Sequence, residues 1–299
     1  MNLLAIVWDF NPTLINIGGF EIRWYSLMWV IALLAGGWLF SYFCKREGKP
    51  ESVSDTAFLY IVLGTIIGAR VGHCLFYEPE VYLPEPWRII TDIRNGGLAS
   101  HGATIGILLG VWLSSRKSKV SVLWTADKLG IIAPLSGGII RLGNLFNSEI
   151  IGNVTDVPWG FKFMRLYPNY AEDMVPMRHP TQLYEAMCYF VLFALLFIVY
   201  RYTTMARKEG FIFGAALVGI FLPRFFIEFI KIDQVAFEEG MTLNMGQWLS
   251  VPFVLIGIAF MAWALWHNRH KAEAPQSATI ATSQPKSPKR RNHQKFNRR

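Results

Sequence analysis

The stretch DKLGIIAPLSGGIIRLGNLFNSEIIG, residues 127–152, is polar at both ends and apolar between them. Residues 129–140 carry no charge, and the first charged residue after them is Arg141. Two amides and a carboxylate follow within the next eight residues: Asn144, Asn147 and Glu149. Because an arginine at bilayer depth costs a few kcal/mol, this pattern predicts a membrane helix that ends in a polar site.

The composition of the whole chain agrees with a membrane location. Of its 299 residues, 53% are hydrophobic and only 17% are charged, whereas a soluble domain carries about 25% charged residues. A helix needs about 20 apolar residues to cross the hydrocarbon core. Seven runs near that length are predicted to span it: 24–43, 56–77, 98–115, 124–142, 180–200, 211–230 and 247–267. Because unpaired backbone groups are costly in lipid, we expect an all-α polytopic membrane protein with about seven transmembrane helices.

The lysines and arginines predict how these spans are oriented. They gather in alternate connections and in the C-terminal region: 44–55, 114–123, 201–210 and 268–299. By the positive-inside rule, these segments face the cytoplasm. The N-terminus is then periplasmic, and so are the intervening regions 78–97, 143–179 and 231–246.

These features predict a division of the chain into two parts. We expect a membrane domain over residues 1–267, with a small periplasmic head mainly at 143–179. Residues 268–299 are very basic, and we expect them to form a disordered cytoplasmic tail. The tail has no aromatic platform and no recognisable nucleic-acid motif, so no nucleic-acid partner is expected. Contact of the tail with anionic lipid headgroups is an open alternative.

Three arginines lie inside or at the outer end of predicted spans, away from the cytoplasmic connections: Arg70, Arg141 and Arg224. An arginine at that depth needs a partner or a purpose. Arg224 could pair with Glu228, which follows one helical turn later. Arg70 could instead hold neighbouring carbonyl groups. Taken together, however, the three guanidinium groups predict a site for an anion.

A histidine adds a second kind of chemistry on the same side. The stretch NGGLASHGATIGILLG, residues 95–110, places His101 at the outer, N-terminal end of the third span. The positive end of a helix dipole disfavours the imidazolium form, and a neutral ring suits a general base. A packing role is the alternative, but the arginines on the same side favour catalysis.

Two further stretches contain candidate supporting residues. Tyr77 lies seven residues after Arg70, on the same predicted helix face. In RHPTQLYEAM, residues 178–187, His179 precedes the fifth span, where it could line the site or cap the helix. Three side chains after it could face the same cavity: Gln182, Tyr184 and Glu185.

Four motifs occur together in the order and spacing of a known family. They are HGATIG (101–106), DKLGIIAPLSGGIIRLGNLFNSEIIG (127–152), RHPTQLYE (178–185) and RFFIEF (224–229). Through them the chain, from about residue 20 to about residue 267, resembles the bacterial prolipoprotein diacylglyceryl transferases. The resemblance implies an enzyme of the bacterial inner membrane with seven helices and a small periplasmic head.

The resemblance also implies a reaction. The family transfers the diacylglyceryl group of phosphatidylglycerol to the lipobox cysteine of a preprolipoprotein, which forms a thioether and releases glycerol phosphate. The partners that it implies are phosphatidylglycerol, signal peptides with a lipobox cysteine, and the lipid bilayer. This chemistry requires no metal or cofactor, and the sequence has no cluster of metal-ligand residues.

The family's functional residues match nine positions of this chain: His101, Arg141, Asn144, Asn147, Glu149, Gly152, Arg224, Glu228 and Tyr25. We expect His101 to take the proton of the thiol, because the thiolate is the nucleophile. Arg141 and Arg224 are expected to bind the leaving phosphate. Phosphatidylglycerol is expected to bind at Arg141, Asn144, Asn147, Gly152 and Tyr25. Supporting roles are expected for Glu149, Glu228, Arg70, Tyr77 and His179.

Two other classes of function remain as alternatives. A transporter or flippase for an anionic lipid or a small anion would use the same arginines and would need no base. Neither an internal repeat nor opposed half-helices are visible in the sequence to support it. An intramembrane hydrolase has less support, because no serine has the spacing of a nucleophile elbow.

Overall fold

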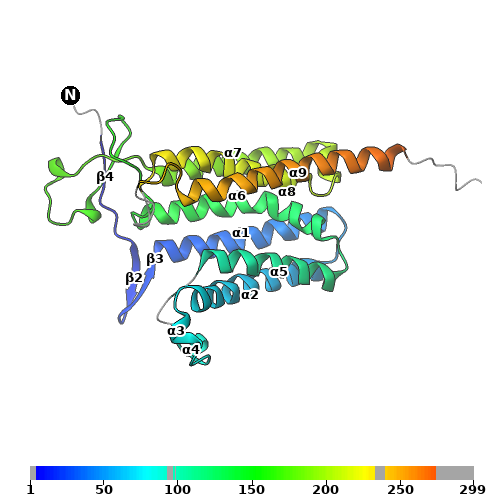
Figure 1. Cartoon of the computed structure of the whole chain (residues 1–299), viewed down its shortest axis with the longest axis horizontal. Helices are drawn as coiled ribbons and strands as arrows, with labels where there is room; N and C mark the ends of the chain where they lie inside the picture. The colour runs from blue at the N-terminus through cyan, green and yellow to red at the C-terminus, as the bar shows by residue number, and fades with distance from the viewer. Residues whose placement is uncertain (1–4, 93–96, 98, 233–239, 274–299) are drawn as a thin grey trace, which may run out of the picture.

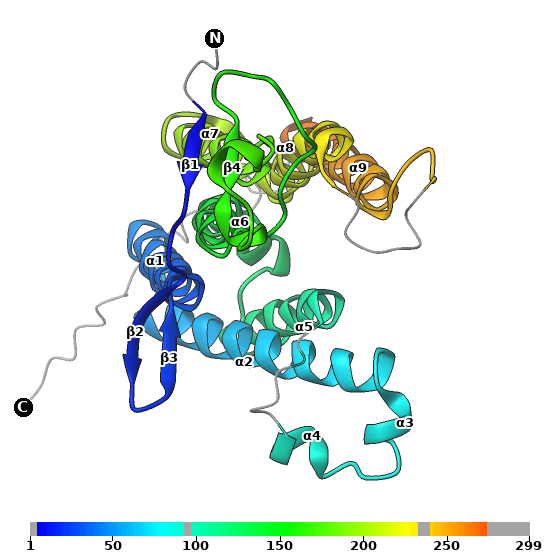
Figure 2. The ribbon, with the colours of Figure 1, turned by 90° about the vertical axis from the view of Figure 1, so that its left-hand side faces the viewer.

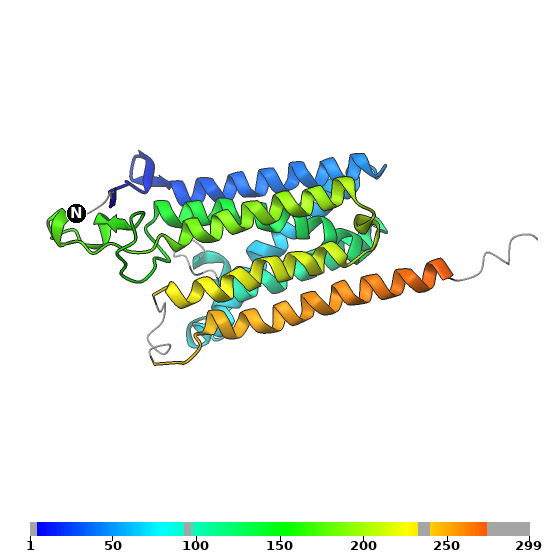
Figure 3. The same ribbon diagram turned by 90° about the horizontal axis from the view of Figure 1, so that it is seen from above.

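The computed structural model describes residues 5–92, 97, 99–232 and 240–273, and most of these residues are helical (Figure 1). The long helices are α1 (Trp24–Arg46), α2 (Glu51–Phe76), α5 (Ser100–Ser118), α6 (Val122–Phe146), α7 (Thr181–Tyr202), α8 (Phe211–Ile227) and α9 (Met245–Glu273). Shorter turns of helix are α3 (Pro79–Tyr82), α4 (Arg88–Thr91), η2 (Met164–Leu166), η3 (Glu172–Met174), η4 (Thr204–Arg207) and η5 (Glu228–Ile230). Helices α1, α6, α7, α8 and α9 run side by side along one axis (Figures 1 and 3), whereas α2 is tilted away from it and runs across the view of Figure 2.

Six helices in the described part of the chain are long and apolar enough to cross a membrane: α1, α2, α6, α7, α8 continued by η5, and α9. The remaining predicted span corresponds to α5, which has 19 residues and is not among the six. Every predicted span lies on one of the long helices, with its ends shifted by a few residues. The largest shift is in α9, which ends at Glu273 instead of 267; residues 274–299 of the expected tail lie outside the described residues. The chain is a multi-pass membrane protein.

Helix α6 lies at the centre of the bundle (Figure 2). It packs against α1, α5, α7 and α8, while α2 pairs with α5 and α8 pairs with α9. Its side chains contribute to a core in which Phe43, Ile131 and Ile212 are completely buried. The polar end of α6, which carries Arg141, is therefore surrounded by several other helices.

Helices α2 and α5 approach each other closely through a row of glycines on each: Gly64, Gly68 and Gly72 on α2, and Gly102, Gly106 and Gly110 on α5. A Cβ atom at Gly72 would lie only 2.7 Å from the Cα atom of Gly102. Small residues at this spacing let two membrane helices pack backbone to backbone. The first turn of α5, which carries His101, is thereby fixed against α2.

At one end of the bundle, an ion pair between a buried lysine and a partly exposed glutamate connects α1, α6 and α7. Lys128 is only 2% exposed, and its amine lies 2.5 Å from Oε1 of Glu47, directly after the last residue of α1. The same carboxylate accepts hydrogen bonds from Trp124 Nε1 at 2.5 Å and from Tyr200 Oη at 2.9 Å. Burial of Lys128 is tolerated because its charge is paired and hydrogen-bonded.

Asp127, the neighbour of Lys128, caps the start of α8. Its two carboxylate oxygens accept the backbone N–H groups of Gly210 and Phe213, each at 2.8 Å. These N–H groups have no partner within the helix, and a carboxylate at a helix N-terminus satisfies them. The polar start of the stretch 127–152 is therefore structural, and its polar end is the candidate site.

The other end of the bundle carries four short strands, so the expectation of an all-α protein is wrong there: β1 (Ile6–Trp8), β2 (Thr13–Ile17), β3 (Phe20–Arg23) and β4 (Phe161–Phe163). Strands β2 and β3 form an antiparallel hairpin, and β1 pairs in parallel with β4. The hairpin turns at Gly18 and Gly19, whose φ angles of 58° and 90° favour glycine. Strands of three to five residues are too short to stand out in a pattern dominated by membrane helices.

The segment between α6 and α7 folds over this strand-bearing end. Trp8 of β1 stacks on Phe161 of β4 with ring centroids 5.6 Å apart, and its indole N–H donates to the carbonyl of Leu145 at 3.1 Å. The predicted head region 143–179 is thus attached directly to the last turn of α6. The N-terminal strand, which is distant in sequence, forms part of the same unit.

Candidate active site

Arg141 lies near the end of α6 and is held by two partners. Its Nε forms an ion pair with Glu185 of α7, which is completely buried. Its Nη1 donates to Oδ1 of Asn144, one turn later on α6, at 3.1 Å. A charge-assisted contact on each side orients the guanidinium group. The structure therefore gives the signature arginine a fixed position at the strand-bearing end.

The two signature asparagines are joined by Glu149. Its carboxylate accepts from Asn144 Nδ2 at 3.2 Å and from Asn147 Nδ2 at 2.9 Å. Glu149, for which the sequence predicted a supporting role, contacts both amides, and Asn144 connects it to Arg141. Asn147 Oδ1 is buried and has no hydrogen-bond partner among the described residues.

A sharp turn after α6 brings Glu149 back toward the helix. Ser148 and Ile150 have φ angles of 58° and 56°, in the left-handed region that only a firmly held turn imposes on residues other than glycine. The start of α7 holds this turn, because Thr181 Oγ1 donates to the carbonyl of Ile150 at 2.6 Å and Gln182 Nε2 donates to the carbonyl of Glu149. The motif RHPTQLYE thus supports the signature motif from a neighbouring helix.

Glu185 has a second cationic partner, Lys231. The Lys231 amine lies 2.6 Å from Glu185 Oε1 and 3.0 Å from Glu228 Oε2. All three side chains are at least nine-tenths buried. Glu228 therefore pairs with Lys231, and its pair with Arg224, an alternative noted from the sequence, is not formed. The backbone N–H of Glu228 still donates to the carbonyl of Arg224, so the difference lies in the side chains: Lys231 follows Glu228 by three residues, after the turn η5, and its amine reaches the carboxylate.

The side chain of Arg224 forms no hydrogen bond or ion pair with the described part of the chain. It lies in the last turn of α8, is partly buried, and is close enough to Glu185 to interact with it electrostatically. A guanidinium group presents five N–H donors and stays charged. Its donors are therefore available to a ligand beside Arg141.

Gly152 lies where three segments meet. Its N–H donates to the carbonyl of His179 at 2.9 Å, and it pairs across an isolated bridge with Lys231. A Cβ atom at this position would lie 2.6 Å from the Cβ of His179 and 2.8 Å from the carbonyl oxygen of Ile230. Only glycine permits this approach without displacement of the Lys231 backbone.

Tyr25, in the first turn of α1, lies against the signature helix. A Cβ atom at Gly143 would meet its ring at 3.0 Å, so the ring packs directly on the α6 backbone at Gly143, two residues after Arg141. It also makes an edge contact with Trp29, at a centroid distance of 6.4 Å. The structure thus brings Tyr25 to the site where the sequence predicted it.

An apolar cavity of about 350 Å³ begins one turn below these residues. It lies between α1, α2 and α6, and Trp29 and Ile140 line its end near the site. Its wall is almost entirely hydrocarbon and includes three glycines, Gly36 and Gly37 of α1 and Gly137 of α6. A polar cluster above an apolar cavity suits a molecule with a charged head and an apolar body.

His101 lies at the same end of the bundle, in the first turn of α5 (Figure 1). Its side chain is exposed and makes no hydrogen bond to the part of the chain that the structure describes. The structure records no contact between it and the Arg141 cluster. Its position is set by the backbone packing of α5 on α2, and its ring is free to meet a substrate.

Arg70 has a different environment from the other two arginines. Its guanidinium group donates to the carbonyl of Ile89 at 2.9 Å and to Tyr82 Oη at 3.2 Å, and it lies over the Tyr82 ring. It therefore holds the segment between α2 and α5 through carbonyl groups, the alternative noted from the sequence. Tyr77, which is 60% exposed, stacks on His73 in the same region.

His179 forms a hydrogen bond between its ring Nδ1 and Tyr184 Oη, at 3.1 Å. Its carbonyl oxygen accepts from Gly152 and from Thr181. Both contacts stabilise the entry into α7. The structure therefore places His179 next to the site and engaged with its scaffold.

Sequence reasoning missed one of the buried charges at this site, Lys231, and gave another, Glu185, no partner. Glu185 was only one of three residues expected near the cavity, and Lys231 was not singled out. A signal for both exists: a carboxylate inside the apolar span 180–200 and a lysine directly after the span 211–230 each need a partner. The sequence does not show that they are partners of each other.

As a class, this is a multi-pass helical membrane protein that gathers cationic and amide side chains at one end of its bundle, above an apolar cavity. The family model of the prolipoprotein diacylglyceryl transferases matches residues 12–263, and the chain belongs to that family. The resemblance seen in the four motifs is thereby confirmed.

Individual relatives cover nearly the whole chain. The phosphatidylglycerol–prolipoprotein diacylglyceryl transferase of Tolumonas auensis is 46% identical over 257 residues, which is 86% of this chain and 96% of the relative. The protein of the same name from Porphyromonas gingivalis is 45% identical over 262 residues, 85% of this chain and 92% of its own. The one from Bacteroides fragilis is 44% identical over 270 residues, 87% of this chain and 95% of its own.

Proposed function

We propose that this protein transfers the diacylglyceryl group of phosphatidylglycerol to the lipobox cysteine of prolipoproteins. The observation that carries the proposal is the cluster at the end of α6, in which Arg141 is fixed by Glu185 and Arg224 is left with free donors. Family membership supports it, because the relatives are named for this activity. The transporter alternative has no support in these comparisons.

The charge of the cluster suits a lipid phosphate. The cationic side chains of Arg141, Arg224 and Lys231 are matched in number by the carboxylates of Glu185, Glu228 and Glu149, but Arg224 forms no ion pair with a described residue. A phosphodiester carries one negative charge and would pair with Arg224. Arginine binds phosphate oxygens in a bidentate manner, and this contact gains strength in a site from which water is excluded.

The same contact would assist the reaction. The cysteine sulfur attacks a saturated carbon of the glycerol unit, a C–S bond forms, and the C–O bond to the phosphate breaks. The electron pair of that bond stays on the leaving glycerol phosphate, where Arg141 and Arg224 stabilise it. The thiol proton must also leave, and we assign its acceptance to His101, directly or through water.

The remaining site residues would position the lipid. We propose that Asn144 and Asn147, held by Glu149, orient phosphate or glycerol oxygens, with Tyr25 beside them. The free Oδ1 of Asn147 could accept a hydrogen bond from a glycerol hydroxyl. The apolar cavity between α1, α2 and α6 could hold part of an acyl chain. Gly152, His179 and Arg70 maintain the backbone around the site.

The chemistry requires a defined place in the cell. We propose seven spans, with α5 as the seventh, a periplasmic strand-bearing end and a cytoplasmic C-terminus in the bacterial inner membrane. The basic connections after α1, α5 and α7 support this orientation. We also propose that residues 1–267 form the membrane domain, with 143–179 as its periplasmic head and 268–299 as a cytoplasmic tail.

A direct test uses the purified full-length protein with phosphatidylglycerol and a lipobox peptide that contains one cysteine. The expected result is a gain of the diacylglyceryl mass on the peptide together with release of an equal amount of glycerol phosphate. A matched peptide with serine in place of cysteine should gain no mass. If neither the mass gain nor the release occurs with protein that is folded in a bilayer, the proposed activity is wrong.

A further inference from the structure

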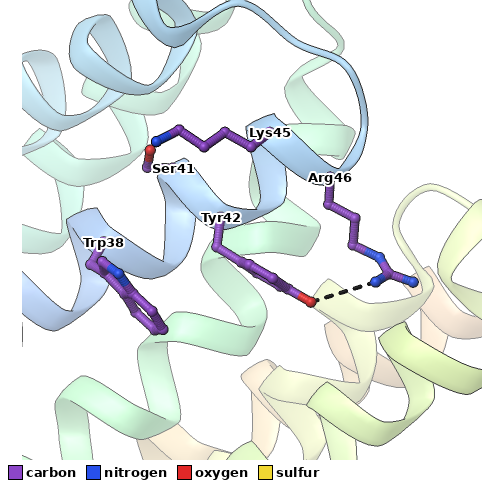
Figure 4. Close-up of a pocket in the computed structure, with 5 residues that line it drawn as sticks. All are labelled: Trp38, Ser41, Tyr42, Lys45 and Arg46. Atoms are coloured by element: carbon purple, nitrogen blue, oxygen red, sulfur yellow. Dashed lines mark hydrogen bonds between the residues drawn. The ribbon is translucent and has the colours of Figure 1, made fainter.

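A second hollow lies at the end of the bundle opposite the candidate active site. It has a volume of about 420 Å³ and is lined by the last two turns of α1: Trp38, Ser41, Tyr42, Lys45 and Arg46. Figure 4 shows these side chains around the hollow, with Trp38 and Tyr42 along one side and the two basic residues at the end of the helix. The hollow thus combines an aromatic wall with cationic side chains.

The aromatic wall faces outward from the bundle. Trp38 is 72% exposed and stacks with Tyr42, at a centroid distance of 6.4 Å and an interplanar angle of 19°. Tyr42 in turn packs on Phe197 of α7, so the hollow is backed by the contact between α1 and α7. An exposed indole at the end of a membrane helix contacts the boundary between lipid tails and headgroups.

Within the part of the chain that the structure describes, neither cation has a carboxylate partner. Arg46 donates to Tyr42 Oη at 3.5 Å and lies over the Tyr200 ring, 5.7 Å from its centroid. Lys45 is exposed and forms neither a hydrogen bond nor an ion pair with any residue that the structure describes. Both side chains therefore keep donors for an anion.

The nearest acidic residue in sequence does not neutralise them. Glu47 follows Arg46 directly, but both of its oxygens are engaged by Lys128, Trp124 and Tyr200. Burial alone would raise the pKa of Glu47, but the hydrogen bonds from these three side chains outweigh it and hold the pKa below its usual value. The carboxylate thus stays ionised and paired with Lys128, and the positive charge of Lys45 and Arg46 is left over.

We propose that this hollow binds an anionic phospholipid of the inner leaflet, at a site separate from that of the substrate. The Lys45 and Arg46 side chains would contact the phosphodiester, the Ser41 hydroxyl would donate to a headgroup or ester oxygen, and Trp38 would lie along the start of an acyl chain. A juxtamembrane cation contributes attraction to an anionic leaflet, and the aromatic wall favours a lipid over free phosphate. The proposal uses the orientation proposed above and does not depend on the transferase reaction.

The test measures where a lipid binds, so its readout is independent of turnover. The full-length protein is placed in phosphatidylcholine nanodiscs that contain a small share of phosphatidylserine with a photoreactive group near its glycerol. After irradiation, mass spectrometry measures the labelled fraction of peptides that cover residues 38–46. We expect labelling about fivefold above that with a photoreactive phosphatidylcholine, the effect of one or two surface cations.

Two variants and one control locate the binding. Lys45→Gln with Arg46→Gln should reduce labelling to the phosphatidylcholine level, and Trp38→Ala should also reduce it with both charges in place. Arg116→Gln with Lys117→Gln removes two charges from the last turn of α5, where Arg116 also lies over a tryptophan, and should leave the labelling unchanged. Diacylglyceryl transfer should persist in all of these variants, which shows that they fold.

Three results would overturn the proposal. Equal labelling by the two photoreactive lipids would show that charge does not select the ligand. An equal loss of labelling in both double variants would indicate diffuse attraction to a basic surface. Complete competition by inorganic phosphate would assign the hollow to a free anion.

Discussion

At the scale of single residues, the central feature of the site is one carboxylate shared by two cations. Glu185 is completely buried and pairs with Arg141 on one side and Lys231 on the other. A buried carboxylate with two cationic partners stays ionised and holds both of them in position. The position of Arg141 therefore depends on Lys231, although the two residues are ninety positions apart in sequence.

Substitution of Lys231 tests this dependence. In Lys231→Met, Glu185 and Glu228 would lose their shared cation and leave uncompensated buried charge, which costs about 3–5 kcal/mol. We expect a lower melting temperature in detergent and a transfer rate reduced by at least tenfold. Lys231→Arg should retain much of the activity, and Lys231→Met combined with Glu228→Gln should regain part of the stability. A Lys231→Met protein with normal stability and rate would contradict the assigned role.

At the residue level, the proximity of the signature residues was predictable from sequence, whereas the partners of the buried carboxylates were not. Arg141, Asn144 and Glu149 lie together because they occupy the last turn of one helix and the turn after it. Glu228 pairs with Lys231 and not with Arg224, although its backbone N–H bonds to the carbonyl of Arg224, because helical spacing permits a side-chain pair and does not impose it. Partners on other helices, such as Glu185 and Lys231, depend on the packing of the bundle and are not visible in local spacing.

At the scale of helices, the backbone contact of α2 with α5 positions His101. A Cβ atom at Gly106 would overlap the carbonyl oxygen of Gly64. Gly106→Ala should therefore push the helices apart, at a cost of about 1–3 kcal/mol, and shift His101 with α5. We expect a lower melting temperature and a slower transfer. Leu108→Ala, at a 57% exposed position on the same helix, is the control and should change the transfer rate little.

Glu47, at the opposite end of the bundle, makes the stability of the protein depend on pH. Hydrogen bonds from Lys128, Trp124 and Tyr200 hold the pKa of Glu47 below its usual value of 4.5, despite the opposing effect of burial. A group with a lowered native pKa stabilises the fold above its unfolded pKa, and this stability is lost as the pH falls through the native pKa. At pH 7 the wild type should have a higher melting temperature than Glu47→Gln. This difference in melting temperature should shrink below about pH 4.5. A difference that is constant down to pH 3 would contradict this account.

The helices themselves were predictable to within a few residues, because membrane spans are set by hydropathy and length. The strands at the other end were not, since three-residue pairings such as β1 with β4 form between segments about 150 residues apart. The glycine rows of α2 and α5 were present in the sequence as repeated four-residue spacings. Their role becomes evident only when the two helices are seen in contact.

At the scale of the whole molecule, the orientation of the bundle decides whether the site can meet its substrates. The strand-bearing end and the site must face the periplasm, where a signal peptide presents its lipobox cysteine. A phosphatase that is active only in the periplasm should be active when it is inserted after residue 170 in the predicted head, and inactive when it is fused after residue 273. The opposite result at either point would reverse the proposed topology.

The charged residues are also divided between the two ends of the bundle. Basic connections lie at the end with Glu47 and Lys128, whereas the polar cluster around Arg141 lies at the end with the strands. This global separation was predictable from sequence, because it follows from the positions of lysine and arginine along the chain. The internal arrangement of the cluster was not, because four helices and a turn contribute to it.

The measurement that tests the central claim most directly is the rate of diacylglyceryl transfer by Arg141→Ala. Wild-type and variant proteins are assayed at saturating phosphatidylglycerol with the cysteine peptide, after correct folding in the bilayer has been verified. Loss of a preorganised charge contact to the leaving group costs about 10²–10³ in rate, so we predict at least that reduction. Arg165→Ala, at an exposed arginine of the head, should transfer within about twofold of wild type, as surface substitutions usually do. Transfer at the wild-type rate by folded Arg141→Ala would contradict the claim that this cluster binds the phosphate of the lipid.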